Sequence, residues 1–265
     1  MKRSIIYLLM FCFAVFCRAE SIELLSVDKW EKTPRLSEKN GVFTLKNPGR
    51  FFSNEFILID RDATYNVSMK VRRTPNTPAF IGHIGFMLYD EAKVMLPTLW
   101  YRFEYGSFST LLEKASQGSK KVIIKRPKNF PADYIRRNLH IVFNAAKDLS
   151  DLPNRTANKI LDCEEISETE LELTLAKPLL ENYPVGTMIR LHSPGPEMYT
   201  LLNGKPVSEE WVELSGKIKG EAKILSNNQW RKKAAFFKVL ISNSPSTADR
   251  GIKMEFKDFK ITVEK

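Results

Sequence analysis

The chain has 265 residues, 43% of them hydrophobic, which is enough for one large domain or two small ones. Its formal charge is +10, but the basic residues are spread out, and no arginine-rich helix or other nucleic-acid-binding motif is present in the sequence. The charge therefore points away from nucleic acid and towards anionic polymers such as sulfated or uronic-acid polysaccharides, although an ordinary solvated basic face gives the same excess.

The first residues have the pattern of a secretory signal peptide. Lys2 and Arg3 precede an apolar run from Ile5 to Cys17, and Ala19 supplies a small residue at a cleavage point. The run is shorter than the ~20 residues that a membrane-spanning helix needs, so we expect residues 1–19 to be removed; an uncleaved anchor is the alternative. We therefore expect a secreted, periplasmic or cell-surface protein with no membrane span after cleavage.

Cysteine usage agrees with a secreted bacterial protein. After removal of residues 1–19 only Cys163 is left, so the mature chain cannot form an internal disulfide. A secreted domain of this size without disulfides depends on its hydrophobic core and is typical of bacteria.

Strands dominate the predicted elements. Alternating apolar and polar residues mark strands, in chain order, in "TYNVSMKV", "LWYRFEY", "LHIVFN", "ELELTLA" and "TMIRLH". The continuous apolar run "AAFFKVLI" predicts a strand buried on both faces. Turn sequences rich in proline, glycine and asparagine separate these runs. Short segments near Phe108–Ala115 and Pro131–Arg137 are the best candidates for helices.

The last strand predicts an irregularity. Ile252, Met254 and Phe256 alternate, but the next aromatic residue, Phe259, follows an odd step. A β-bulge or a break at Lys257–Asp258 would restore one apolar face. The whole pattern predicts an all-β antiparallel sandwich, with residues 20–265 forming a single domain that is elaborated by long loops between Gln117 and Pro206.

Five segments resemble the galactose-binding-like jelly rolls of many carbohydrate-binding proteins. The early segments "FILIDRDATYNVSMKVRR" and "IGHIGFMLYDEAK", the late segments "WVELSGKIKG" and "AAFFKVLI", and the closing "GIKMEFKDFKITVEK" carry this resemblance. It covers Phe51–Val94 and Trp211–Lys265, and it implies a two-sheet jelly roll with carbohydrate as partner. It also implies a structural calcium, with Asp258 of the closing strand and Glu23 of the other side as ligands.

The residues do not assemble a catalytic motif in the sequence. His83, His140 and His192 are isolated, and His83 lies near Gly82 and Gly85, whose small size relieves crowding on an inner strand. A buried, hydrogen-bonded histidine is the ordinary outcome for such positions. The acidic neighbours of Cys163 raise a thiol pKa, which argues against a nucleophile. No pair of carboxylates stands out as the acid and base of a glycosidase.

Aromatic residues suggest a surface for sugar rings. In the predicted strand "LWYRFEY", Trp100 lies on the same side as Arg102, and Tyr199 and Trp230 lie in segments that we expect to be loops. These four residues are the predicted carbohydrate-binding set, with core packing as the alternative for each ring. Trp30 and Trp211 are predicted to be core residues.

The sequence therefore predicts a secreted, non-catalytic protein that binds carbohydrate, with a preference for acidic or sulfated polysaccharide. Two alternatives stay open. One is a structural or adhesion module of the cell envelope that binds protein. The other is a polysaccharide lyase or hydrolase built on a β-sandwich.

Overall fold

The computed structural model describes residues 20–24, 26–47, 49–243 and 251–265. Within them the chain is almost entirely β, with nineteen strands and two short 3-10 helices, η1 (Val27–Lys29) and η2 (Thr98–Trp100). The predicted signal peptide, residues 1–19, lies outside the described residues. None of the helices in the described part of the chain is long and apolar enough to cross a membrane.

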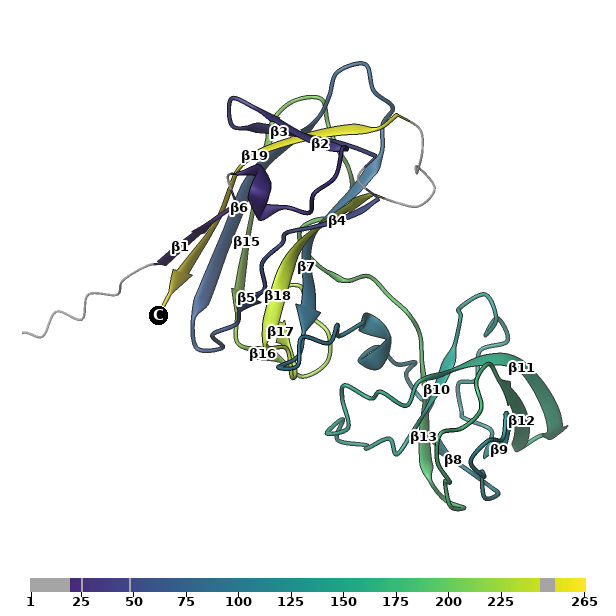
Figure 1. Cartoon of the computed structure of the whole chain (residues 1–265). Helices are drawn as coiled ribbons and strands as arrows, with labels where there is room; N and C mark the ends of the chain where they lie inside the picture. Colours follow the sequence, from purple (N-terminus) through teal and green to yellow (C-terminus); the bar gives the residue numbers. More distant parts are fainter. Residues whose placement is uncertain (1–19, 25, 48, 244–250) are drawn as a thin grey trace, which may run out of the picture.

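Two antiparallel sheets form the sandwich seen in the upper part of Figure 1. The first sheet has the order β15 (Val212–Lys219), β6 (Thr64–Arg73), β19 (Lys253–Glu264), β3 (Val42–Lys46) and β2 (Leu36–Lys39), with β1 (Glu20–Glu23) also pairing with β19. The second has the order β14 (Met198–Pro206), β7 (Ile81–Tyr89), β18 (Phe236–Asn243) and β4 (Arg50–Phe52), with β5 (Ile57–Leu58) also pairing with β18. A small parallel pair, β16 (Glu221–Ala222) and β17 (Trp230–Arg231), lies at one end of the sandwich.

The predicted alternation builds the core between these sheets. Tyr65, Val67, Met69 and Val71 of β6 are all buried, while the polar residues that alternate with them are half-exposed. Trp30 is a core residue, as predicted, and stacks on Phe51 at 5.4 Å between ring centroids. An apolar residue at every second position thus seals the inner face of a strand whose other face meets water.

The predicted bulge in β19 is confirmed. The register between β19 and β6 shifts between Lys257 and Lys260, and Asp258 has a positive φ of 55°. Both Phe256 and Phe259 are buried as a result. The extra residue lets two runs of opposite phase face the same core.

A third antiparallel sheet belongs to the inserted body, which we define as residues 103–192 and which lies at the lower right of Figure 1. Its order is β8 (Ser109–Thr110), β13 (Met188–His192), β10 (His140–Phe143), β11 (Asn158–Ser167), β12 (Glu170–Leu175) and β9 (Lys121–Lys125). The segment expected to consist of long loops is thus largely a sheet with its own hydrophobic cluster, which includes Ile141, Leu173 and Leu191. Whether residues 20–265 behave as a single domain stays a prediction.

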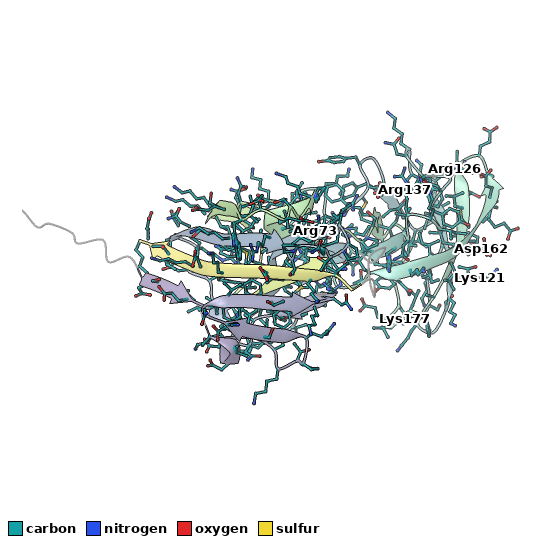
Figure 2. All side chains as sticks on the ribbon, turned by 90° about the horizontal axis from the view of Figure 1, so that it is seen from above. Arg73, Lys121, Arg126, Arg137, Asp162 and Lys177 are labelled. Carbon is teal, nitrogen blue, oxygen red and sulfur yellow. The ribbon has the colours of Figure 1, made fainter. Side chains whose placement is uncertain are left out.

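The two helices expected in this region are absent from the described residues. Ser109–Thr110 is the short strand β8, and residues 132–138 form turns. Part of the surface charge of the inserted body is paired within that body. Figure 2 labels Lys121, Arg126, Arg137, Asp162 and Lys177 on it, and three of these cations contact carboxylates: Lys121 with Glu172, Arg126 with Glu165 and Arg137 with Glu104.

Candidate functional site

The second sheet of the sandwich has one face on the core and an opposite, outer face. In β7, Ile84, Phe86 and Leu88 point into the core, so His83, Gly85, Met87 and Tyr89 point outward. The pairing register shows which residues of the neighbouring strands β18 and β4 share this outer face. His83 is opposite Ser242, which is opposite Arg50; Gly85 is opposite Leu240, which is opposite Phe52; and Tyr89 is opposite Phe236.

Half-exposed aromatic rings gather at one end of the outer face. Phe56, just before β5, lies 4.9 Å from Tyr89 and 6.2 Å from Phe236, measured between ring centroids. Two ammonium groups lie over this ring, those of Lys238 at 4.5 Å and Lys93 at 5.0 Å from its centroid. These cation–π contacts hold both cations beside the aromatic cluster, where an anion can reach them.

Charged side chains cross the middle of the same face. The guanidinium of Arg50 lies 3.3 Å from a carboxylate oxygen of Glu197, the residue before β14, and 6.0 Å from the ring of Phe52. Met87 and Leu240 below are fully buried although they do not belong to the sandwich core. Burial raises the pKa of Tyr89, on which the charges of Glu31, Arg50 and Glu197 also act, so its hydroxyl keeps its proton and can donate a hydrogen bond.

Tyr199, predicted from sequence to line a loop rim, lies instead in β14 and contributes to this face. Its ring is half-buried and lies 4.6 Å from the ring of His83. Gly85 makes this possible, because a Cβ there would overlap the carbonyl oxygen of Met198. The predicted role of Gly85 in relieving crowding is therefore confirmed.

His83 is set up as a hydrogen-bond donor. The backbone N–H of Gly204 donates to its Nδ1 at 3.1 Å, and burial lowers the pKa of the imidazole. A neutral ring that accepts at Nδ1 carries its proton on Nε2. Nε2 can then donate a hydrogen bond to a hydroxyl or carboxylate, but it cannot act as a base without a change of tautomer.

Trp100 and Arg102 are not on a strand, contrary to the alternation predicted for "LWYRFEY". Trp100 ends η2 and is half-buried, with the guanidinium of Arg155 at 5.0 Å from its ring. Arg155 in turn pairs with Asp90. Arg102 is exposed and donates to the carbonyl of Pro194 at 2.9 Å. The two side chains therefore do not form the joint platform that the sequence suggested.

For two tryptophans, the observed exposure differs from the predicted one. Trp230, predicted at a loop rim, is 0% exposed and stacks on Phe237 at 5.1 Å inside the core. Its expected surface position is wrong, because β17 turns the ring inward while the loop before it stays exposed. Trp211, predicted in the core, is half-buried, and Arg72 and Lys257 each lie 4.6 Å from its ring.

The predicted calcium ligands lie on the first sheet in cationic surroundings. Asp258 is exposed and pairs with Lys70 at 3.0 Å, and Glu23 lies opposite Lys260 in the β1–β19 register. Calcium needs about six to eight oxygen ligands. No group of three or more histidine, cysteine, aspartate or glutamate side chains in the described chain is placed to hold a metal. These residues do not fit a calcium cage, and the ion stays a prediction that melting with and without a chelator can test.

The remaining histidines and the cysteine have structural surroundings. His140 and His192 are opposite each other on β10 and β13, and His83 lies on another sheet. His192 is fully buried, accepts from Arg190 Nε at 2.9 Å and contacts the Leu99 carbonyl at 2.7 Å. Burial raises the pKa of Cys163 to about 11, in the direction expected from sequence.

The aspartates in the hollow between the sandwich and the inserted body are held in ion pairs with arginines. This hollow includes Asp90, Asp151 and Arg155. Asp90 pairs with Arg155, and Asp151 lies 2.8 Å from the buried guanidinium of Arg190. Carboxylates fixed by arginines are poor candidates for exchanging protons with a substrate.

Comparison with known proteins does not assign the chain to a family. No protein-family model and no curated protein matches the chain. A solved structure of winged bean acidic lectin complexed with methyl-α-D-galactose is similar over 93% of this chain and 99% of the lectin chain, at 13% sequence identity and a TM-score of 0.30. A TM-score this low is too weak to relate the two folds, and nothing about this chain is inferred from the lectin or its sugar.

Proposed function

We propose that the protein is a non-catalytic carbohydrate-binding protein and that the outer face of its second sheet binds an acidic polysaccharide. The observation that carries the proposal is the gathering of half-exposed rings and cations on one rigid sheet face. The rings are Phe52, Phe56, Tyr89, Tyr199 and Phe236, and the cations are Arg50, Lys93 and Lys238.

The chemistry of these groups suits an anionic sugar. Aromatic rings offer flat apolar surfaces to the C–H faces of sugar rings. Guanidinium and ammonium groups bind carboxylate or sulfate through charge-assisted hydrogen bonds. Strands hold all of these side chains except Phe56 and Lys93 in a fixed arrangement, so little ordering is needed when a ligand binds.

Affinity electrophoresis and calorimetry with heparin, alginate and neutral dextran test this proposal. We expect the acidic polymers to bind and dextran to bind weakly or not at all. Tyr89→Ala and Lys238→Gln should each lower the affinity roughly tenfold. Trp211→Ala is the matched control, because that ring also lies beside two cations but on the first sheet.

Three other outcomes would each favour a different site or function. An unchanged affinity in Tyr89→Ala would place the site off the outer face. Release of unsaturated sugars, seen as a rise in ultraviolet absorbance, would favour the lyase alternative. If none of the polymers binds, the structural or adhesion module becomes the better hypothesis.

The proposal includes secretion. It is supported by the signal-like pattern of residues 1–19 and by a mature chain that has Cys163 as its single cysteine. Expression in a bacterium with its native leader, followed by cell fractionation and intact mass measurement, tests both the cleavage site and the periplasmic or external location. A full-length mass in the cytoplasmic fraction would contradict it.

A further inference from the structure

A second hollow lies beside the outer face, where the inserted body begins. It has a volume of about 400 Å³ and is lined by Arg102, Phe103, Glu104, Tyr105, Ile224 and Leu225. We call it the junction groove. One wall is the start of the inserted body, and the other is the loop that connects β16 to β17, at the end of the sandwich in Figure 1.

Tyr105 is the most exposed aromatic residue of this groove, at 78%, and Leu225 opposite is 36% exposed. The alternation in "LWYRFEY" predicts a strand position for Tyr105, but residues 104–108 form a turn and irregular backbone. Its ring lines the groove together with the exposed guanidinium of Arg102 and the half-exposed rings and side chains beside it, so an apolar surface and a cation lie side by side here.

Buried side chains support the wall of the groove that carries Tyr105. Phe103, 5.4 Å from Tyr105 between ring centroids, packs on the fully buried Arg190, whose guanidinium carbon lies 5.0 Å from its ring. Arg190 is fixed in turn by its ion pair with Asp151. The backbone carbonyl of Tyr105 accepts from Asn129 Nδ2 at 3.1 Å. The position of the Tyr105 backbone is therefore set by the fold.

One short loop joins the groove to the outer face. Arg102 donates to the carbonyl of Pro194, and Thr98 Oγ1 donates to the carbonyl of Pro196 at 2.7 Å. The next residue, Glu197, pairs with Arg50 of the outer face. Gly195 lets this loop lie close to Arg102, since a Cβ there would press on the guanidinium. The two sites therefore share one structural support.

We propose that the junction groove binds further sugar units of the same anionic chain that occupies the outer face, with Tyr105 stacking on a sugar ring and Arg102 pairing with a carboxylate or sulfate. This inference rests on the proposed function. It adds that the protein selects long chains over short ones, because only a long chain reaches both sites. The gain follows from linking two binding events on one ligand.

A size series of heparin oligosaccharides, from the disaccharide upward, tests the inference by calorimetry on the full mature chain. Wild-type affinity should rise with length and then level off. Tyr105→Ala and Arg102→Gln should lower the affinity for the longest chains roughly five- to tenfold and leave that for the shortest unchanged. Tyr105→Phe keeps the ring and should behave as wild type, as should Trp211→Ala.

The outcomes separate the two proposals. If the groove variants bind chains of every length as wild type does, while Tyr89→Ala loses affinity, the inference is overturned and the proposed function stands. An equal loss at every length also overturns it, because the groove would then be the primary site. If wild type binds no oligosaccharide of the series, the inference fails together with acidic-glycan binding. Thermal melts confirm that each variant is folded.

Discussion

A buried cluster of polar side chains links the sandwich to the inserted body. Arg190 and His192 of β13 are both fully buried, and His192 lies between the Arg190 side chain and the carbonyl of Leu99. Asp151 neutralises the guanidinium, and the rings of Phe103 and Phe108 lie on it at 5.0 and 5.1 Å. A charge without these partners would be costly in such a place.

The stability of the protein should fall at mildly acidic pH because of His192. Burial lowers the pKa of this imidazole from 6.5 to about 4. The unfolded chain therefore binds a proton that the folded chain excludes, so the contribution of His192 is complete above pH ~6.5 and is lost as pH falls to ~4, amounting to about 3 kcal/mol. Urea unfolding across this range should give a flatter pH profile for His192→Gln than for wild type.

The matched control is His83→Gln. His83 is half-exposed, so it stays in contact with water, although partial burial lowers the pKa of its imidazole too. We expect its pH profile to stay close to that of wild type. If His192→Gln retains the full wild-type slope between pH 6.5 and 5, the acid sensitivity comes from carboxylates or other histidines and the assignment is wrong.

At the scale of elements, the bulge in β19 decides which residues reach the core. Asp258 occupies the left-handed region with φ of 55° and points to the surface. Non-glycine residues pay an energetic cost there, but aspartate and asparagine tolerate the region better than β-branched residues do. One residue therefore sets the phase of the six residues that follow it in the strand, including Ile261 and Val263.

Asp258→Val should destabilise the protein by about 1–2 kcal/mol, because a β-branched side chain is strained at positive φ. Asp258→Gly loses the ion pair with Lys70 but relieves the strain, so its free energy of unfolding should lie within about 0.5 kcal/mol of wild type. Chemical denaturation of the two variants measures the difference. Equal losses in both would show that the Lys70 pair, and not the backbone conformation, is what matters.

Local patterns in the sequence were enough to predict several strands of both bodies, among them β6, β12 and β18, and the bulge in β19. Alternation in β6 and the odd step from Phe256 to Phe259 are properties of neighbouring residues, and the structure confirms both. Exposure of single rings was not predictable in this way. Trp230 follows a polar loop and is buried, while Tyr105 follows an apolar alternation and is exposed. Their places depend on packing between segments distant in sequence.

The same limit applies to the candidate site. Of the four predicted residues, Tyr199 lies on the outer face, Arg102 lines the junction groove, Trp100 is covered on one side by Arg155, and Trp230 is in the core. Tyr89, Phe56 and Arg50 come together only because β7, β5 and β4 all pair with β18. No spacing in the sequence brings them together, so the sequence indicated the kind of residue but not the surface.

For the whole molecule, the inserted body enters and leaves the sandwich at one point. Phe103 and His192 form an antiparallel bridge, and the N–H of Ser193 donates to the carbonyl of Arg102 at 3.2 Å. The two ends of residues 103–192 are therefore adjacent. Each body has its own hydrophobic cluster, but Leu152 of the inserted body is buried in the sandwich cluster.

These observations predict the result of removing the inserted body. A chain in which two glycines join Arg102 to Ser193 should still fold cooperatively. These two residues are already adjacent in the full chain, and both sheets of the sandwich are complete without the inserted body. Its stability should be lower by about 2–5 kcal/mol, since the loss of Leu152 leaves buried apolar surface without a partner. Thermal and urea unfolding measure both properties, with Leu152→Ala in the full chain as the control for that one contact. A shortened chain that stays unfolded would mean that residues 20–265 form a single cooperative domain. A folded one that binds long and short acidic oligosaccharides with equal affinity would assign the outer face to the sandwich and the length selection to the junction groove.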